Sequence, residues 1–179
     1  IQECRLSVTA FSNKYNALPG DFDKAAEFIH GDLKNGNNNG TIEGFGLDSR
    51  DSEAVSFWEH LSAADMIPQP GKSIGKAAFG KGVPSCKFGG GITVVHNPYP
   101  DMPGHWFLVG RENGTQGNGA LFTPQQALSL LMKADNPDPS SGSMRVKEGA
   151  NSPNGSCLKD PQHFNINNKA PACVLYVQF

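Results

Sequence analysis

The segment 35–42, with the sequence NGNNNGTI, comes nearest in this protein to a metal-binding pattern. Oxygen-bearing side chains stand at its first, third and fifth positions, a glycine at the sixth and an apolar residue at the eighth. An EF-hand loop binds calcium through side-chain oxygens at this spacing. The candidate calcium ligands are Asn35, Asn37, Asn39 and Thr41, with Asp32, Glu43 or Asp48 as carboxylate donors.

A plain turn is the competing interpretation of the same segment. The ligand positions are neutral Asn residues, and Gly46 occupies the twelfth position, where an EF-hand has a bidentate Glu. Asn and Gly also form tight turns without any metal, because both tolerate the left-handed backbone conformation. We therefore favour a turn, and the sequence predicts no cofactor apart from this calcium hypothesis.

The sequence contains no pattern that is typical of a catalytic centre or of a zinc site. Five histidines occur without the HExxH or CxxC…HxxxH spacings of zinc proteins: His30, His60, His96, His105 and His163. No GxSxG turn presents a serine nucleophile, and Gly71-Lys72-Ser73 lacks the upstream glycine of a phosphate-binding loop. We therefore predict that the protein is not an enzyme.

Two smaller groups of polar residues have simple explanations. Asp48, Asp51 and Glu53 could contain an acid pair, but carboxylates at this place are more simply explained as the solvated start of a helix, whose N-terminus they stabilise. His96 and His105 lie on either side of a Pro-rich turn, so we expect them to face each other across two adjacent strands.

The four cysteines are even in number and include no CxxC pair, which disfavours a zinc ribbon and a thioredoxin-type site. They are Cys4, Cys86, Cys157 and Cys173. Two disulfides in an oxidising compartment explain them best, and four buried free thiols in a cytosolic protein are the alternative. Four cysteines allow three pairings, and sequence alone does not exclude any of them.

The composition is that of one globular domain with many loops. The 179 residues suffice to bury a core, and 21 Gly and 13 Pro require extensive turns. The 15 basic and 17 acidic residues form no long runs, so the protein lacks the electrostatic footprint of a nucleic-acid-binding protein. No stretch approaches the about 20 apolar residues that span a bilayer.

Apolar residues at spacings of three and four predict a helix over residues 1–15. No capping residue precedes Ile1, so we expect this helix to be the C-terminal half of a longer one. Pro19 and Gly20 end it by Leu18. Asp21 is then expected to cap a short second helix that runs to residue 29.

The rest of the sequence alternates loops with short regular elements. Residues 31–48 are predicted to form a long surface loop, and 70–91 an irregular segment. A helix over 53–66 is capped by Asp51 or Ser52, and another begins at Thr123-Pro124 and ends at Asn136-Pro137. Strands are predicted over 92–96, 105–110, 121–122, 143–147 and 172–179. Because helices cluster apart from strands, the fold class is α+β with a mostly antiparallel sheet.

The run FSNKYNALPGDF at residues 11–22, followed by Ala25 and by NGTI at 39–42, resembles a segment of type IV pilin-like proteins. In that family the segment follows the hydrophobic anchor, and YNALPGDF is the most specific part of the likeness. Shorter likenesses are Ser52-Glu53, FWEHL at 57–61, Ala64 and Met66-Ile67, and looser ones are LFTPQQA at 121–127 and GSMRV at 142–146.

The resemblance implies a pilin-like fold with one globular domain over residues 1–179. Residues 1–17 would be the C-terminal half of a spine helix that packs on the sheet, and residues 18–179 would form the head, with long loops and short additional helices. The family's apolar N-terminal helix and cleavable leader are not in this sequence, so the protein would be the head domain without its anchor.

The resemblance also implies a function: a structural subunit of a type IV pilus or of a type II secretion-like pseudopilus, with surface loops for adhesion, motility, DNA uptake or secretion. Its partners would be other pilin subunits in a helical filament and the inner-membrane assembly machinery. The precursor would be anchored in the bacterial inner membrane, and the mature, methylated subunit would lie in an extracellular filament or in the periplasm.

The resemblance further implies how the cysteines pair. Cys157 and Cys173 would close a loop like the C-terminal disulfide loop of type IV pilins, and Cys4, facing inward from the spine, would pair with Cys86. Two other functions compete with the filament subunit. One is a secreted adhesin-like binding module without a filament role, and the other is an extracellular hydrolase whose catalytic residues lie on loops.

Overall fold

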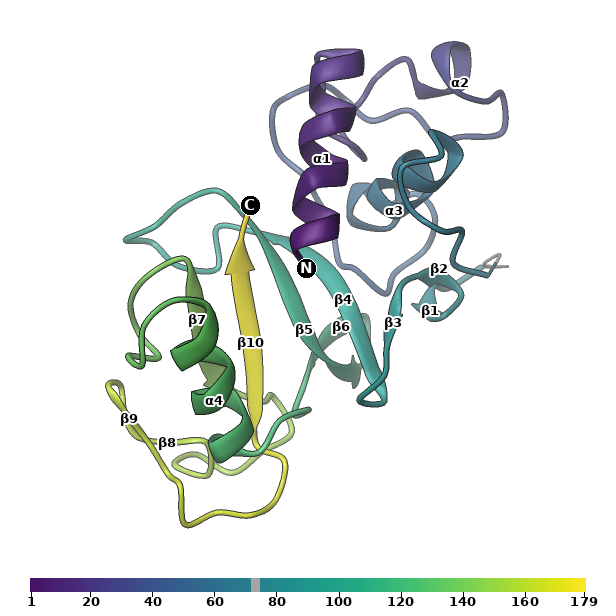
Figure 1. Cartoon of the computed structure of the whole chain (residues 1–179). Helices are drawn as coiled ribbons and strands as arrows, with labels where there is room; N and C mark the ends of the chain where they lie inside the picture. Colours follow the sequence, from purple (N-terminus) through teal and green to yellow (C-terminus); the bar gives the residue numbers. More distant parts are fainter. Residues whose placement is uncertain (72–74) are drawn as a thin grey trace.

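The computed structural model describes residues 1–71 and 75–179. Its helices are α1 (Gln2–Tyr15), α2 (Ala25–Phe28), α3 (Glu53–Ala63) and α4 (Pro124–Ala134). Its strands are β1 (Ala78–Phe79), β2 (Gly82–Val83), β3 (Ser85–Cys86), β4 (Gly90–His96), β5 (His105–Asn113), β6 (Gln116–Gly119), β7 (Met144–Glu148), β8 (Leu158–Asp160), β9 (His163–Phe164) and β10 (Cys173–Gln178). The helical N-terminal part and the sheet occupy different parts of the molecule (Figure 1).

The main sheet is antiparallel throughout and has the order β3-β4-β5-β10-β7, with β6 paired to β5. The C-terminal strand β10 therefore lies inside the sheet, between β5 and β7. In addition, β1 pairs with β2 and β8 with β9. These observations confirm the predicted α+β class and the mostly antiparallel sheet.

The sheet has two different faces because successive side chains of a strand point to opposite sides. The inner face carries Phe107 and Val109 of β5 with Leu175 and Val177 of β10, and these belong to the main core. Helix α4 packs against β7 and β10, and α3 packs against β4. The outer face carries a second apolar cluster, formed by Tyr99, Trp106, Leu108, Val174 and Tyr176.

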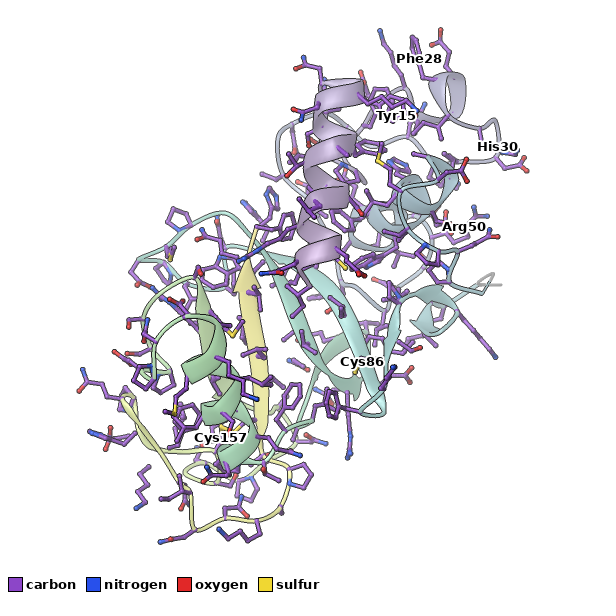
Figure 2. All side chains as sticks on the ribbon, in the orientation of Figure 1. Tyr15, Phe28, His30, Arg50, Cys86 and Cys157 are labelled. Atoms are coloured by element: carbon purple, nitrogen blue, oxygen red, sulfur yellow. A yellow bond between two sulfur atoms is a disulfide. The ribbon has the colours of Figure 1, made fainter. Side chains whose placement is uncertain are left out.

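Helix α1 forms as predicted and ends at Asn16, which adopts the left-handed conformation with φ 51°. Its ring Phe11 is fully buried and contacts Tyr15, Phe22 and His60. Helix α1 stands at one end of the sheet and extends away from it, with Tyr15 and Phe28 at the far end (Figures 1 and 2). The aromatic contacts of its second half are therefore made with α3 and the segment that follows α1.

The first turn of α1 is the part that reaches the sheet. The Arg5 guanidinium donates from Nε to the carbonyl oxygen of Gln178, at 2.8 Å, beside the end of β10. The expected arrangement, a spine helix lying along the sheet, thus differs from the observed one. The physical reason is that the largest buried residue of α1, Phe11, packs its ring against Phe22 and against the ring of His60 on α3.

Helix α4 begins as its sequence predicts. The Thr123 hydroxyl accepts a hydrogen bond from the Gln126 backbone, and the Gln126 side chain accepts one from the Thr123 backbone, so both halves of a capping box form. Ser52 is the N-cap of α3, but its side chain makes no capping bond and donates instead to Phe45 O at 3.0 Å.

Several short segments differ from the prediction. The region 70–91, predicted to be irregular, contains the two-residue strands β1, β2 and β3, and the strands β8 and β9 were not predicted. Residues 121–122 form only an isolated bridge between Phe122 and Cys173, whereas β6, at Gln116–Gly119, was not predicted because its sequence QGNG has turn composition. Among the described residues, no helix combines the length and the apolar character that crossing a membrane requires.

Candidate functional site

The candidate site is built around the loop of residues 31–46. The residues that bind this loop are themselves positioned by Gly20, which precedes it. This glycine is buried and has φ +87°, and a Cβ atom at its position would lie 2.5 Å from the carbonyl oxygen of Glu53. Its amide donates to His60 Nδ1 at 2.9 Å. Only glycine combines this backbone conformation with this close approach to α3.

Asp21 is the next residue and the main acceptor for the loop. Its side chain is buried, and its two carboxylate oxygens accept hydrogen bonds from Asn39 N at 3.0 Å and from Gly40 N at 2.8 Å. The prediction that Asp21 caps a second helix is therefore wrong, since α2 begins at Ala25 with Lys24 as its N-cap. The Asp21 carboxylate binds the amides of the loop instead of the first amides of α2.

Glu53, in the first turn of α3, binds the same loop at two further points. Its carboxylate accepts from Asn37 N and from Glu43 N, both at 3.0 Å. Burial raises the pKa of Glu53, and the two backbone hydrogen bonds act against that rise. Glu53 is thus a loop-binding residue, not simply the solvated helix start that its place in the first turn of α3 predicts.

Two neutral histidines complete the attachment. His60 also bonds through Nε2 to Lys34 O at 2.7 Å, and His105 Nε2 accepts from Ile42 N at 3.0 Å. Burial lowers the pKa of His60, and burial together with the nearby His96 lowers the pKa of His105 to about 4. As predicted, His96 and His105 pair across β4 and β5, with ring centroids 4.8 Å apart.

The predicted calcium ligands lie on this loop, and each Asn oxygen accepts a hydrogen bond. Asn35 Oδ1 accepts from Ala26 N, Asn37 Oδ1 from Asn39 N, and Asn39 Oδ1 from both the amide and the hydroxyl of Thr41. In residues 1–71 and 75–179, no three His, Cys, Asp or Glu side chains gather as a metal site requires. These contacts are those of a turn, and the calcium site stays a prediction.

The loop forms one wall of a groove on the outer face of the sheet. The groove has a volume of about 670 Å³, and Thr93, Val95, Leu108 and Tyr176 line its floor. Residues 41–46, Pro98 and Gln116 also line it. The volume falls within the range of small-molecule pockets, about 300–1,000 Å³. Phe45, which is 49% exposed, stands on the rim.

Arg145 of β7 binds the turn between β4 and β5 to the outer face of the sheet. Its guanidinium is almost completely buried and forms two parallel bonds with the Asp101 carboxylate, at 2.9 and 2.8 Å. It also lies 4.7 Å from the centroid of the Tyr99 ring. The bidentate pair lowers the pKa of Asp101. The turn between β4 and β5 is thereby fixed on the sheet.

Lys147, two residues along β7, strengthens the same attachment. Its Nζ donates to Pro98 O at 2.9 Å and lies 4.0 Å from the centroid of the Tyr99 ring. Burial, and then the charge of Arg145, lower the pKa of Lys147. The cation–aromatic contacts were not foreseen from sequence, because the partners are more than 40 residues apart in the sequence.

A disulfide joins Cys157 to Cys173, with Cα atoms 5.1 Å apart. The loop that it closes is also bound by Glu148 at the end of β7. The Glu148 carboxylate accepts from the backbone amides of Gly155, Cys157 and Leu158, at 2.9 to 3.1 Å. The expected C-terminal disulfide is therefore present in the structure.

Cys4 and Cys86 are free thiols, so the favoured Cys4–Cys86 bridge is not formed. Cys86 pairs with Gly90 at the beginning of β4, whereas Cys4 precedes Arg5, which binds the end of β10. The beginning of β4, beside Cys86, and the end of β10, near Cys4, lie at opposite ends of the sheet, which are separated by roughly 17 Å of strand. The Cα atoms of disulfide-bonded cysteines lie within about 7 Å of each other. Cys86 and Cys157 appear in Figure 2. Burial raises the pKa of Cys4.

The remaining candidate residues do not assemble into one centre. Asp48 Oδ1 accepts from Ser49 N, and Asp51 pairs with Lys34 at 3.0 Å. His163 contacts Asp160 at 2.7 Å on the exposed β8–β9 hairpin. Lys72 and Ser73, whose segment lacks the upstream glycine of a phosphate-binding loop, lie outside the described residues.

Searches of the protein-family models, of curated proteins and of solved structures found no match to this protein.

Proposed function

We propose that this protein is the head domain of a type IV pilin-like or pseudopilin subunit, a structural component of a bacterial filament and not an enzyme. In this proposal α1 is the end of the spine helix, and the head displays the loop 31–46 and the disulfide loop on the filament surface. The partners are further copies of the subunit and the inner-membrane assembly machinery, and the assembled protein lies outside the cytoplasm.

The proposal depends on the contacts made by residues 15–22, with the sequence YNALPGDF. This run is also the most specific part of the family resemblance. Asn16 ends α1 in the left-handed conformation, Gly20 contacts α3 where no side chain fits, and Asp21 binds the loop amides. Phe22 packs against Phe11 and Tyr15 of α1. The run therefore makes a rigid joint between helix and head, which a filament subunit requires.

The mixed helix and sheet composition and the C-terminal disulfide also support the proposal. Pilin-like subunits present a stable head on a helix, and a disulfide restricts the unfolded polypeptide in an oxidising compartment. The groove on the outer face favours a second candidate, a secreted adhesin-like binding module without a filament role. Its volume and its largely apolar floor are those of a ligand pocket.

The coding sequence upstream of Ile1 distinguishes the two candidates. A short basic leader that ends in Gly, followed by an apolar stretch with an early Glu, is expected for the filament subunit, whereas an ordinary signal peptide would contradict it. A second test expresses the precursor with a pilus assembly system and recovers sheared filaments. The Gly20→Val variant should abolish recovery of this subunit in filaments, while Gly31→Ala, where a Cβ meets nothing within 4 Å, should leave it unchanged.

A further inference from the structure

Five Asn-Gly pairs occur in the sequence, at residues 35–36, 39–40, 113–114, 118–119 and 154–155. At such a pair the glycine amide nitrogen, after losing its proton to solvent base, attacks the Cγ atom of Asn. The bond between Cγ and Nδ2 breaks, ammonia leaves, and a cyclic imide forms. Water then opens the imide to Asp or isoaspartate. A bulky side group on the following residue would hinder this attack, and glycine has none.

The two pairs in the loop 31–46 have their glycine amides engaged. Gly36 N donates to Phe22 O at 2.9 Å, and Gly40 N donates to the buried Asp21 carboxylate at 2.8 Å. The attack requires this nitrogen to leave its acceptor and lose a proton, which its hydrogen bond opposes. A bond to a carboxylate is stronger than one between neutral groups, so Gly40 is the better protected of the two.

The pairs 154–155 and 118–119 are also restrained. Gly155 N donates to Glu148 Oε1 at 3.1 Å, two residues before Cys157, where the loop that the disulfide closes begins. Gly119 is buried in β6, in register with Arg111 of β5. Imide formation at either pair would have to distort a clamped loop or a paired strand.

The fifth pair, Asn113-Gly114, lies at the tip of the hairpin between β5 and β6. Both residues are exposed, Gly114 has φ +61°, and the structure describes no acceptor for the Gly114 amide. The Asn113 side chain makes one hydrogen bond, from Nδ2 to Asn118 Oδ1 at 2.9 Å. A hydrogen bond to the nitrogen that leaves does not block the carbon that is attacked.

We infer that Asn113 is a site of spontaneous deamidation, and that the folded structure directs the reaction to it among the five pairs. The change matters for the groove, because the hairpin tip supports its wall: Leu47 N donates to Thr115 O at 2.9 Å, and Gln116 lines the groove. Deamidation adds a negative charge beside Glu112, and isoaspartate adds a backbone methylene at the tip. Both changes loosen this support.

The test incubates the folded protein in mildly alkaline buffer and follows each Asn-Gly pair by peptide mass spectrometry. Asn113 should convert at least roughly tenfold faster than each of the other four, because its glycine amide lacks their restraints. Equal or faster conversion at any other pair in the folded protein would overturn the inference. In denaturant with reductant, the five rates should converge; an undiminished lead of Asn113 there would show that local sequence directs the reaction, and would also overturn it.

Two variants separate the causes. Asn113→Ser should remove the main product while the protein keeps its melting temperature, and persistence of that product would place the reaction elsewhere. Glu148→Ala removes the acceptor of Gly155 N and should accelerate conversion of Asn154 roughly tenfold while leaving Asn113 unchanged. No acceleration at Asn154 in a folded variant would show that the amide bonds do not protect these pairs.

Discussion

Residues 31–48 are rich in Gly and Asn, residues 149–172 are rich in Asn, and neither segment contains a helix. The first is held by side chains from elsewhere in the fold, since Asp21, Glu53, His60 and His105 all bind its backbone. The second is held by the Cys157–Cys173 disulfide and by one carboxylate, that of Glu148. The first loop acquires a fixed path without regular secondary structure, and the second contains only the short β8–β9 hairpin.

The two loops differ in the solution condition that breaks the interactions which fix them. A hydrogen bond that a neutral histidine nitrogen accepts, such as the one from Ile42 N to His105 Nε2, ends when that nitrogen is protonated, whereas a disulfide ends when it is reduced. We therefore expect the loop 31–48 to respond to pH and the loop 149–172 to respond to reducing agents. One loop can thus be perturbed while the other serves as an internal reference.

The largest effect is expected from removing the disulfide. The double variant Cys157→Ser with Cys173→Ser should lower the free energy of unfolding by about 3 kcal/mol, because the unfolded polypeptide loses a loop constraint. Chemical denaturation measures the loss, and Cys86→Ser, which changes a free thiol, is the control. A loss no greater than that of the control would show that Glu148 alone fixes the loop.

The next effect is expected at Asp21. Asp21→Asn replaces one accepting oxygen by an NH2 group, which cannot accept from a loop N–H, so we expect a loss of about 2 kcal/mol in the free energy of unfolding. The exposed neighbour Asp23 provides the matched control, as Asp23→Asn. Equal stability of the two variants would contradict the assignment of Asp21 as the main acceptor of the first loop.

A smaller effect is expected from pH. An unfolded His titrates near 6.5, and the pKa of His105 in the folded protein is about 4. Between these values the unfolded state binds more protons, so the free energy of unfolding should fall as the pH decreases from about 6.5 toward 4. We expect a loss on the order of 1 kcal/mol from this partly exposed ring.

Two other groups affect the same pH range. The lowered pKa of His60 adds to the loss, whereas the raised pKa of Glu53 opposes it, because the folded state then retains a proton longer as the pH rises. His105→Gln should flatten the profile, while the exposed His30→Gln should not. Identical pH profiles for wild type and His105→Gln would contradict the role of His105.

The smallest effect is expected from calcium. Because the Asn oxygens of the loop 35–41 already accept hydrogen bonds, calorimetric titration with calcium should release no heat and the melting temperature should stay unchanged. A rise in melting temperature that Asn37→Ala abolishes would establish the calcium site and reverse our preference for a turn.

The regular elements were largely predictable because each depends on a local pattern. The apolar stripe predicted α1, Thr123-Pro124 predicted the start of α4, and alternation predicted β10 with its two faces. Local pattern failed where composition resembles a turn, as at β6, and where a polar residue has a distant partner. Asp21 looked like a helix cap because its partners, Asn39 and Gly40, are 18 and 19 residues away.

The candidate site was predictable only in part. The sequence indicated the loop 31–48 and the facing pair His96 and His105, but not the groove, since its floor combines β4 and β5 with β10, which is distant in the sequence. Arg145 and Asp101 are 44 residues apart, and no local signal indicates such a pair. The Cys4–Cys86 bridge failed for a related reason: it assumed that α1 lies along the sheet.

Hydrogen exchange of the backbone amides in both loops tests the central comparison most directly. At neutral pH the amides of Gly40, Ile42, Cys157 and Leu158 should all exchange slowly, because each donates to a fixed acceptor. Acidification toward pH 4, corrected for intrinsic exchange rates, should deprotect Ile42, whereas reduction should deprotect Cys157 and Leu158 and leave Ile42 protected. Continued protection of Ile42 in acid, or equal loss of protection in both loops on reduction, would contradict the account.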